Sequence, residues 1–243
     1  MTTARPLFHA ALTADFFNAS GEPKFRDLGL TQFSDHSHVQ VQPFAQHSPV
    51  IEAAQLATCH GVVVLTPRVT AESLQGATNL LVVSRFGVGY DSVDVEACTQ
   101  AGVMVTITAG AVDRPVAEAT VGWMIALSHH MLVKDRLVRT GQWQARTDYM
   151  GRELRERQLG VIGLGGIGRE LLRLLQTFGM QQPLVFDPFL STETAAQLGV
   201  RLVSLEELLR ASDFVSIHCP LTEQTRGRSE EHTSELQSHS DLV

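Results

Sequence analysis

The chain has 243 residues, a formal net charge of −7 and 44% apolar residues, an apolar fraction typical of globular domains with a buried core. The mild negative charge gives no electrostatic reason to expect nucleic acid as a partner, and no apolar run approaches the roughly 20 residues of a membrane span. The three cysteines are widely spaced and form neither a disulfide framework nor a zinc motif. We therefore expect a cytoplasmic protein of one or two domains, without a metal site or a membrane segment.

Short β-type runs recur through the first half of the chain, and helix-like stretches separate several of them. The runs are nearly continuous in valine, leucine and isoleucine, as expected for parallel strands covered on both faces. Strands are expected at 6–12, 38–44, 61–67, 79–87 and 102–109, and helices at 49–59, 70–76 and 92–101. This alternation predicts a parallel sheet with helices on both faces.

A long helix is expected within residues 112–143. Asp113 suits a helix cap, Pro115 suits the first turn, and apolar residues then recur with a helical period as far as Met131. A second alternating pattern follows, with a strand, tight turn and helix at 157–179, strands at 183–188, 200–205 and 213–220, and helices at 192–199 and 206–212. Both halves are typical of doubly wound domains, and the boundary is expected near residues 108–112.

Residues 163–168 read GLGGIG and match the pattern G-x-G-x-x-G between a strand-like and a helix-like run. In a dinucleotide site the first glycine turns the chain, the second lets the backbone approach the pyrophosphate, and the third lets the helix pack closely on the strand. Asp187 ends the next strand, nineteen residues after Gly168. A carboxylate there can bind the ribose 2′-hydroxyl and would repel a 2′-phosphate, which favours NAD over NADP. The alternative is an α/β turn with incidental glycines.

Six segments together resemble the D-isomer-specific 2-hydroxyacid dehydrogenases, especially the phosphoglycerate dehydrogenases. They run in family order between residues 79 and 227, whereas earlier residues match in pattern only. The segments are NLLVVSRFGVGYDSVDVEACTQAGVMV, AVDRPVAEATVGWMIAL, GQW, LGVIGLGGIGRELLRLLQTFGM, VFDP and SDFVSIHCPLTEQTRG. The resemblance implies an α/β protein of two doubly wound parallel-sheet domains. These would be a flavodoxin-like substrate domain at 1–110 and an incomplete Rossmann NAD-binding domain at 111–227.

The resemblance also implies NAD-dependent hydride transfer at the C2 of a small D-2-hydroxy acid or 2-oxo acid. The substrate carboxylate would be bound by Arg85, Gly87, Val88 and Gly89, unless these glycines only turn the chain. The cofactor would be bound by Val88, Gly163, Gly165, Gly166, Ile167, Gly168, Asp187, His218, Cys219, Pro220 and Thr225. Relatives often carry Arg or Lys at the position of Gly166, so backbone N–H groups would hold the pyrophosphate here. A homodimer through the long helix, between Val116 and Met131, is implied as well.

The family's catalytic groups have no match in this sequence. The family uses an Arg in an N-x-[AS]-R-G segment and then a Glu and a His, all beyond the position that corresponds to Gly227. Residues from Arg228 to Val243 instead resemble the in-frame translation of a sequencing adapter, so we expect an artefactual or disordered tail at 228–243. We name no catalytic residue and expect a C-terminally truncated, inactive fragment of an active dehydrogenase. The alternatives are an NAD-binding regulatory protein of the same fold without catalysis, and a structural domain with unused glycines.

Overall fold

The computed structural model describes residues 6–227, and the chain divides into two compact units between Ala109 and Gly110. The tail that was expected at 228–243 lies outside the described residues. Among the helices that are described, none is both long enough and apolar enough to cross a membrane.

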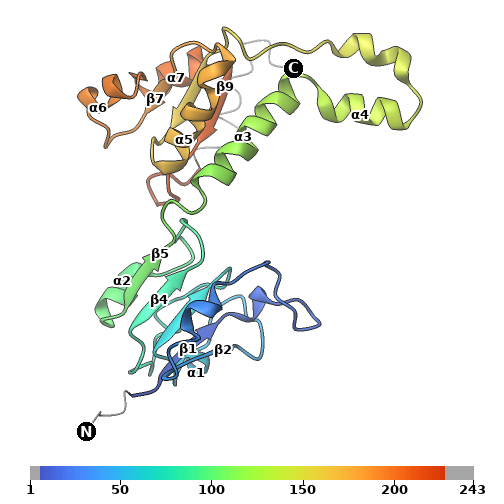
Figure 1. Cartoon of the computed structure of the whole chain (residues 1–243). Helices are drawn as coiled ribbons and strands as arrows, with labels where there is room; N and C mark the ends of the chain where they lie inside the picture. The colour runs from blue at the N-terminus through green and yellow to red at the C-terminus, as the bar shows by residue number, and fades with distance from the viewer. Residues whose placement is uncertain (1–5, 228–243) are drawn as a thin grey trace. The chain divides into compact units, whose positions relative to one another are not determined.

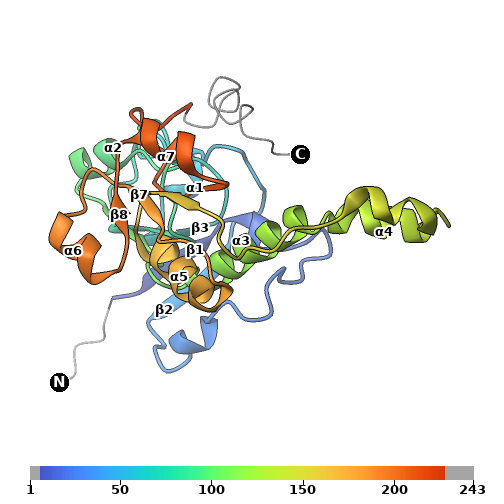
Figure 2. The same ribbon diagram turned by 90° about the horizontal axis from the view of Figure 1, so that it is seen from above.

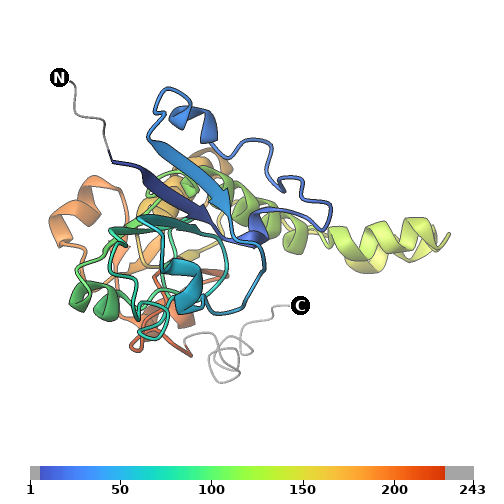
Figure 3. The ribbon, with the colours of Figure 1, turned by 90° about the horizontal axis from the view of Figure 1, so that it is seen from below.

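The first unit is built on a parallel sheet of five strands in the order β2-β1-β3-β4-β5 (Figure 1). The strands are β1 (Phe8–Leu12), β2 (Val39–Pro43), β3 (Gly61–Val64), β4 (Val82–Arg85) and β5 (Met104–Ile107). Figure 3 shows β1 and β2 side by side as the two blue arrows. This strand order is the flavodoxin-like one, and it reverses between β1 and β3.

Short helices accompany this sheet. They are η1 (Ala14–Phe16), η2 (Leu30–Phe33), α1 (Ala53–Leu56) and α2 (Val95–Gln100). The side chain of Asp94 caps α2 by accepting a hydrogen bond from the Ala97 N–H at 2.8 Å. Val62, Val64 and Val83 of the central strands are at most 1% exposed, which agrees with the apolar runs expected for a covered parallel sheet.

The helix expected at 70–76 is wrong, because this segment is a run of turns. The Ser73 hydroxyl donates to the Ile51 carbonyl at 2.5 Å and accepts from the Thr70 N–H at 3.1 Å. Gly76 ends the segment with a left-handed φ of +74°. A serine side chain that hydrogen-bonds to nearby backbone groups competes with the hydrogen bonds of a helix. A helix of seven residues would have too few backbone hydrogen bonds to outweigh this competition.

The second unit contains a parallel sheet of four strands in the order β8-β7-β6-β9. The strands are β6 (Leu159–Ile162), β7 (Leu184–Phe186), β8 (Arg201–Leu202) and β9 (Phe214–Ile217). This order corresponds to the first four strands of the Rossmann order 3-2-1-4-5-6. The order reverses between β6 and β9, which is where doubly wound sheets bind their ligands.

The longest helices of the second unit are α3 and α5, which pack against each other on the sheet (Figure 1). The helices are α3 (Asp113–Ser128), α4 (Met131–Arg139), η3 (Trp143–Tyr149), α5 (Gly166–Leu175), η4 (Gln176–Phe178), α6 (Thr192–Gln197) and α7 (Leu205–Ala211). Ala117 of α3 and Leu171 of α5 are fully buried at the centre of this packing. Helix α4 instead extends away from the sheet of its own unit, as Figure 2 shows from above.

The single long helix expected as far as Met131 is interrupted, which corrects that prediction. Helix α3 ends at Ser128, and His130 has a left-handed φ of +50° before α4 begins. The Arg152 N–H donates to the Ser128 carbonyl at 2.9 Å, so a distant segment satisfies the helix end. The periodicity of apolar residues continues through the break and therefore gives no sign of it.

Candidate functional site

The glycine-rich turn joins β6 to α5 at the carboxyl edge of the second unit's sheet. The loop after β9 begins at the same edge, and Asp187 follows the neighbouring strand β7. Because β6, β7 and β9 are parallel, all the second-unit residues predicted to contact the cofactor follow carboxyl ends of adjacent strands. They surround the reversal of strand order between β6 and β9, where a dinucleotide binds in Rossmann folds.

Gly163 makes the turn out of β6. Its φ is +86°, and its N–H donates to the Phe186 carbonyl at 2.9 Å. A Cβ added to Gly163 would lie 2.8 Å from the backbone nitrogen of Cys219 and 2.9 Å from its Cα. Both the conformation and the contact with the loop after β9 therefore require glycine at this position.

The other two glycines of the pattern have different surroundings. A Cβ on Gly168 would lie 2.9 Å from the Gly163 carbonyl oxygen, so the third glycine lets α5 approach the turn. Gly165 caps α5 and is exposed, and a Cβ there would meet no atom within 4 Å. The N–H groups of Gly166, Ile167 and Gly168 belong to the first helical turn and have no intrahelical acceptor. The turn therefore has three backbone N–H groups without a helical acceptor, and they lie beside Gly165, where no side chain fills the space. This arrangement suits the binding of an anion.

Asp187, which directly follows β7, connects this strand to the glycine-rich turn by a hydrogen bond. One carboxylate oxygen accepts from the Leu164 N–H at 2.8 Å, and the other accepts from the Phe189 N–H at 2.9 Å. Each oxygen keeps a further lone pair, so the half-buried carboxylate can also accept a ligand hydroxyl.

The loop after β9 contributes His218, Cys219, Pro220 and Thr225. Burial lowers the pKa of the His218 imidazole, whose Nε2 lies 2.8 Å from the hydroxyl of Ser216. Cys219 is the residue that packs against Gly163. The Thr225 hydroxyl donates to the Pro220 carbonyl at 2.6 Å and so closes the loop on itself.

Asp113 lies against the first residue of α5. It was expected to cap α3, but Val112 is the cap, Asp113 is the first helical residue, and no side chain makes a capping bond. A Cβ added to Gly166 would overlap Asp113 Oδ2 and would lie 2.6 Å from its Cγ. The Asp113 carboxylate thus fills the space of a side chain at position 166. The sequence gives no signal of this contact, because 53 positions separate the two residues.

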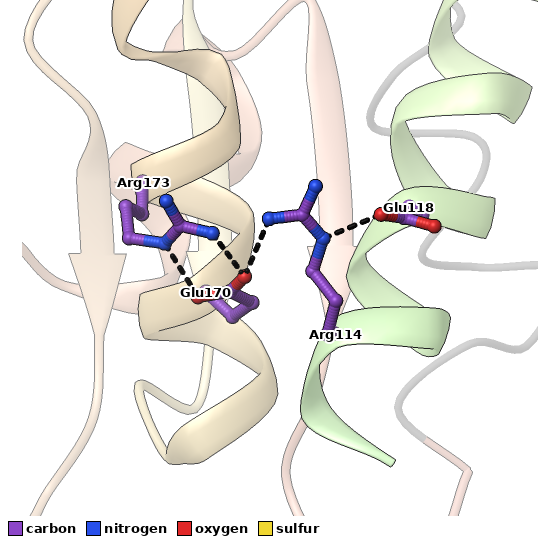
Figure 4. A network of polar contacts seen from close by, with 4 residues as sticks. All are labelled: Arg114, Glu118, Glu170 and Arg173. Carbon is purple, nitrogen blue, oxygen red and sulfur yellow. Dashed lines mark hydrogen bonds and ion pairs between the residues drawn. The ribbon is translucent and has the colours of Figure 1, made fainter.

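Next to Asp113, an ion-pair network on the surface links α3 to α5 (Figure 4). Arg114 of α3 pairs with Glu118 of its own helix and, at 3.2 Å, with Glu170 of α5. Arg173 binds the same Glu170 at 2.7 Å. Hydrogen bonds from Arg173 and then Arg114 lower the pKa of Glu170 to about 2, against the opposing effect of desolvation.

The predicted substrate loop follows β4 in the first unit. The Arg85 guanidinium turns back and donates to the Phe86 carbonyl, and a Cβ on Gly87 would lie 2.9 Å from Arg85 Nη1. The Gly87 N–H donates to the Arg85 carbonyl at 2.9 Å, so it is already engaged. The N–H groups of Val88 and Gly89 have no hydrogen-bond partner within residues 6–227. Two of the three predicted backbone donors are therefore free to bind a carboxylate.

A second polar cluster, which the sequence did not indicate, lies where the strand order of the first unit reverses. Asp15 follows β1 and is 9% exposed, and its carboxylate accepts from the N–H of Thr66 at 2.9 Å and from the Thr66 hydroxyl. Burial opposes ionisation, but hydrogen bonds from Thr13 and Thr66 hold the pKa of Asp15 below its ordinary value. Only the strand order reveals that Asp15 and Thr66 are neighbours, because β1 and β3 are not consecutive strands.

Comparisons with known proteins agree with this arrangement. Residues 121–240 match the family model "D-isomer specific 2-hydroxyacid dehydrogenase, NAD binding domain". Human D-3-phosphoglycerate dehydrogenase is 37% identical over 181 residues, which cover 74% of this chain and 34% of that protein. Glyoxylate reductase of Korarchaeum cryptofilum is 34% identical over 204 residues, which cover 82% of this chain and 61% of that protein. The chain therefore spans about a third of the first relative and under two thirds of the second.

A solved structure gives the same result for the fold. The glyoxylate reductase from Paecilomyes thermophila superposes with a TM-score of 0.78 at 25% identity, covering 96% of this chain and 71% of that one. The superposition includes the flavodoxin-like and the Rossmann-like sheets. With its strand orders, its glycine-rich turn and the matched NAD-binding domain, the chain belongs to the D-isomer-specific 2-hydroxyacid dehydrogenase family.

Proposed function

We propose that the chain belongs to an NAD-dependent oxidoreductase that transfers a hydride between nicotinamide and the C2 of a D-2-hydroxy acid or 2-oxo acid. The observation that carries this proposal is the glycine-rich turn at the reversal of strand order, with Asp187 bonded to it at 2.8 Å. The residues present fit a dinucleotide, because Gly163 and Gly168 allow close approach and Gly165 leaves open space. In this proposal residues 1–110 bind the substrate and residues 111–227 bind NAD.

The cofactor contacts follow from the chemistry of each group. Backbone N–H groups of Gly166, Ile167 and Gly168 hold the pyrophosphate at the N-terminus of α5, where the helix dipole favours an anion. Asp187 accepts a hydrogen bond from the adenosine ribose, and its charge disfavours a 2′-phosphate. The loop from His218 to Thr225 follows β9, the strand next to β6, so it begins at the same sheet edge as the glycine-rich turn. When bound, NAD supplies the hydride acceptor and the protein supplies position.

The substrate carboxylate binds to the free N–H groups of Val88 and Gly89 in the first unit. Arg85 contributes positive charge next to this loop rather than a direct contact, because its guanidinium is turned onto the Phe86 carbonyl. Reduction of a ketone builds negative charge on oxygen and therefore needs a cation and a proton donor. We assign neither role to a residue within 6–227. We propose that the chain as given binds NAD(H) without turnover.

We also propose that the protein is a homodimer in the cytoplasm. Trp123 and Leu127 of α3 and Leu132 and Val138 of α4 are between 56% and 66% exposed. Such a set of large apolar side chains on two successive helices suits contact with a second copy. The three cysteines are all free, which suits a reducing compartment.

Titration of the purified chain with NADH, followed by the change in nucleotide fluorescence, tests the proposed cofactor. We expect saturable binding of NADH and much weaker binding of NADPH. Absence of NADH binding would overturn the cofactor assignment, whereas equal affinities would overturn the role of Asp187. Incubation with NADH and a panel of 2-oxo acids then tests turnover, and measurable NADH oxidation would refute the proposal that this chain lacks the catalytic groups.

A further inference from the structure

The N-terminus of α5 already has a negative charge beside it. Asp113 comes from α3, and its carboxylate lies over Gly166, the first residue of α5. An acidic group at a helix N-terminus is stabilised by the partial positive charge there. The same partial charge attracts the pyrophosphate of a bound dinucleotide. The Asp113 carboxylate and the phosphates of a bound dinucleotide are therefore both attracted by the partial positive charge at the N-terminus of α5, and they repel each other.

No ion pair in the described residues neutralises Asp113. The adjacent cation, Arg114, is directed toward Glu118 and Glu170 instead, as Figure 4 shows. Arg169, near the start of α5, donates through Nε to the Leu164 carbonyl at 3.2 Å and has no ion pair with Asp113. The negative charge of Asp113 is therefore uncompensated within 6–227 by any direct contact.

Asp113 also restricts the residue at position 166. A Cβ at Gly166 would overlap the Asp113 carboxylate, so no side chain fits there unless Asp113 moves. The two positions form a coupled pair in which glycine at 166 leaves room for the acidic group at 113. A longer side chain at 166 would require the Asp113 carboxylate to turn away from the start of α5.

We propose that Asp113 determines the affinity of this protein for its dinucleotide: it fills the space over Gly166 and weakens binding by repelling the pyrophosphate. The proposal rests on the proposed function, because it presupposes that the glycine-rich turn binds NAD(H). It makes Asp113 a residue that tunes cofactor release, with no contact to the reacting atoms.

The Asp113→Asn variant tests the charge at nearly unchanged volume, and the whole chain is titrated with NADH, ADP-ribose and adenosine. Removing one negative charge from beside the first residue of α5 should tighten the binding of NADH and ADP-ribose by about three- to tenfold at low salt. The gain should shrink at about 1 M salt, where the Debye length is near 3 Å. Adenosine carries no phosphate, so its affinity should not change. Asp135→Asn on α4 is the matched control, since it removes the same charge from an exposed ion pair with Arg139.

The contact itself is tested by a double-mutant cycle on stability. Gly166→Ala should lower the denaturation midpoint of the second unit by a small amount in the wild-type background, because the Asp113 carboxylate must turn away from the new Cβ. In an Asp113→Ala background the same substitution should have little effect, since the space is then open. Equal losses in the two backgrounds would show that Asp113 does not fill this space and would overturn the proposal.

The outcomes separate this inference from the proposed function. If the wild-type chain fails to bind NADH, the proposed function fails first. If the wild-type chain binds NADH but Asp113→Asn binds it no more tightly than Asp135→Asn does, only the role of Asp113 is refuted. An equal gain for adenosine would also refute it, because that result would indicate a structural change rather than relief of charge repulsion.

Discussion

Alanine substitutions at two glycines of the same turn, Gly163 and Gly165, should affect different properties of the protein. In Gly163→Ala the new methyl group must adopt a φ of +86° and lies 2.8 Å from the Cys219 backbone nitrogen. In Gly165→Ala the φ of −76° is ordinary and no atom lies within 4 Å of the new Cβ. We expect the first substitution to damage the fold and the second to damage only cofactor binding.

The magnitude for Gly163→Ala has two parts. A left-handed conformation costs a residue with a Cβ about 1–2 kcal/mol. Forcing a methyl group against packed backbone costs about 1–3 kcal/mol more. The sum, about 2–5 kcal/mol, is a large fraction of the stability of a typical domain, about 5–15 kcal/mol. Gly165→Ala should change stability by about 1 kcal/mol or less, as expected for alanine at a helix cap.

Urea denaturation followed by tryptophan fluorescence measures this difference. Both tryptophans of the chain, Trp123 and Trp143, lie in the second unit, so the signal reports the unit that contains the turn. With a slope of about 2 kcal/mol per molar urea, Gly163→Ala should move the midpoint down by about 1–2.5 M. Gly165→Ala should move the midpoint by about 0.5 M or less and should lose NADH affinity. A Gly163→Ala protein as stable as the wild type would refute the close approach of the turn to the β9 loop.

Three further outcomes are expected. The pKa of Glu170 is depressed to about 2, so the contribution of its carboxylate to stability is present above the unfolded value near 4.5 and is lost as the pH falls from there toward 2. The unfolding midpoints of the wild type and Glu170→Gln should therefore converge over this pH interval. Parallel profiles of midpoint against pH would contradict the ion pairs. Burial depresses the pKa of His218 below 6.5, so the imidazole binds a proton at higher pH in the unfolded state than in the folded state, and stability falls as the pH drops through 6.5. In NMR spectra, the imidazole resonance that is absent from His218→Gln should titrate below this value. Trp123→Glu on the exposed face of α3 should halve the mass measured by light scattering, and an unchanged mass would place the dimer contact elsewhere.

The sequence predicts the parts of this fold in which one short segment decides the structure. The alternation of apolar runs and amphipathic stretches is enough for the two α/β sheets, because covered parallel strands must be apolar. The glycine spacing at 163–168 is enough for the turn, because Gly163 and Gly168 each make a close approach that excludes a Cβ, and Gly165 leaves open space for a ligand. The place of Asp187 at the end of a strand is likewise a local feature.

Features that depend on contacts between distant segments could not be predicted in this way. The break at His130 is accompanied by a hydrogen bond between Arg152 and Ser128, and the turns at 70–76 are accompanied by one between Ser73 and Ile51. Neither bond has a signature in the local sequence. Apolar periodicity reports which face of a segment is buried, and it is insensitive to a single residue in a left-handed conformation.

The same distinction explains why the site could be predicted only in part. Backbone donors come with the turn, so their positions follow from the glycine pattern alone. The charge that surrounds those donors depends on which other helix packs beside α5, and here α3 brings both Asp113 and the Arg114–Glu170 pair. A motif therefore specifies that a phosphate can bind, whereas the affinity depends on tertiary neighbours that the motif does not contain. For this chain the neighbour is acidic, and this opposes the anion that the glycine-rich turn is built to hold.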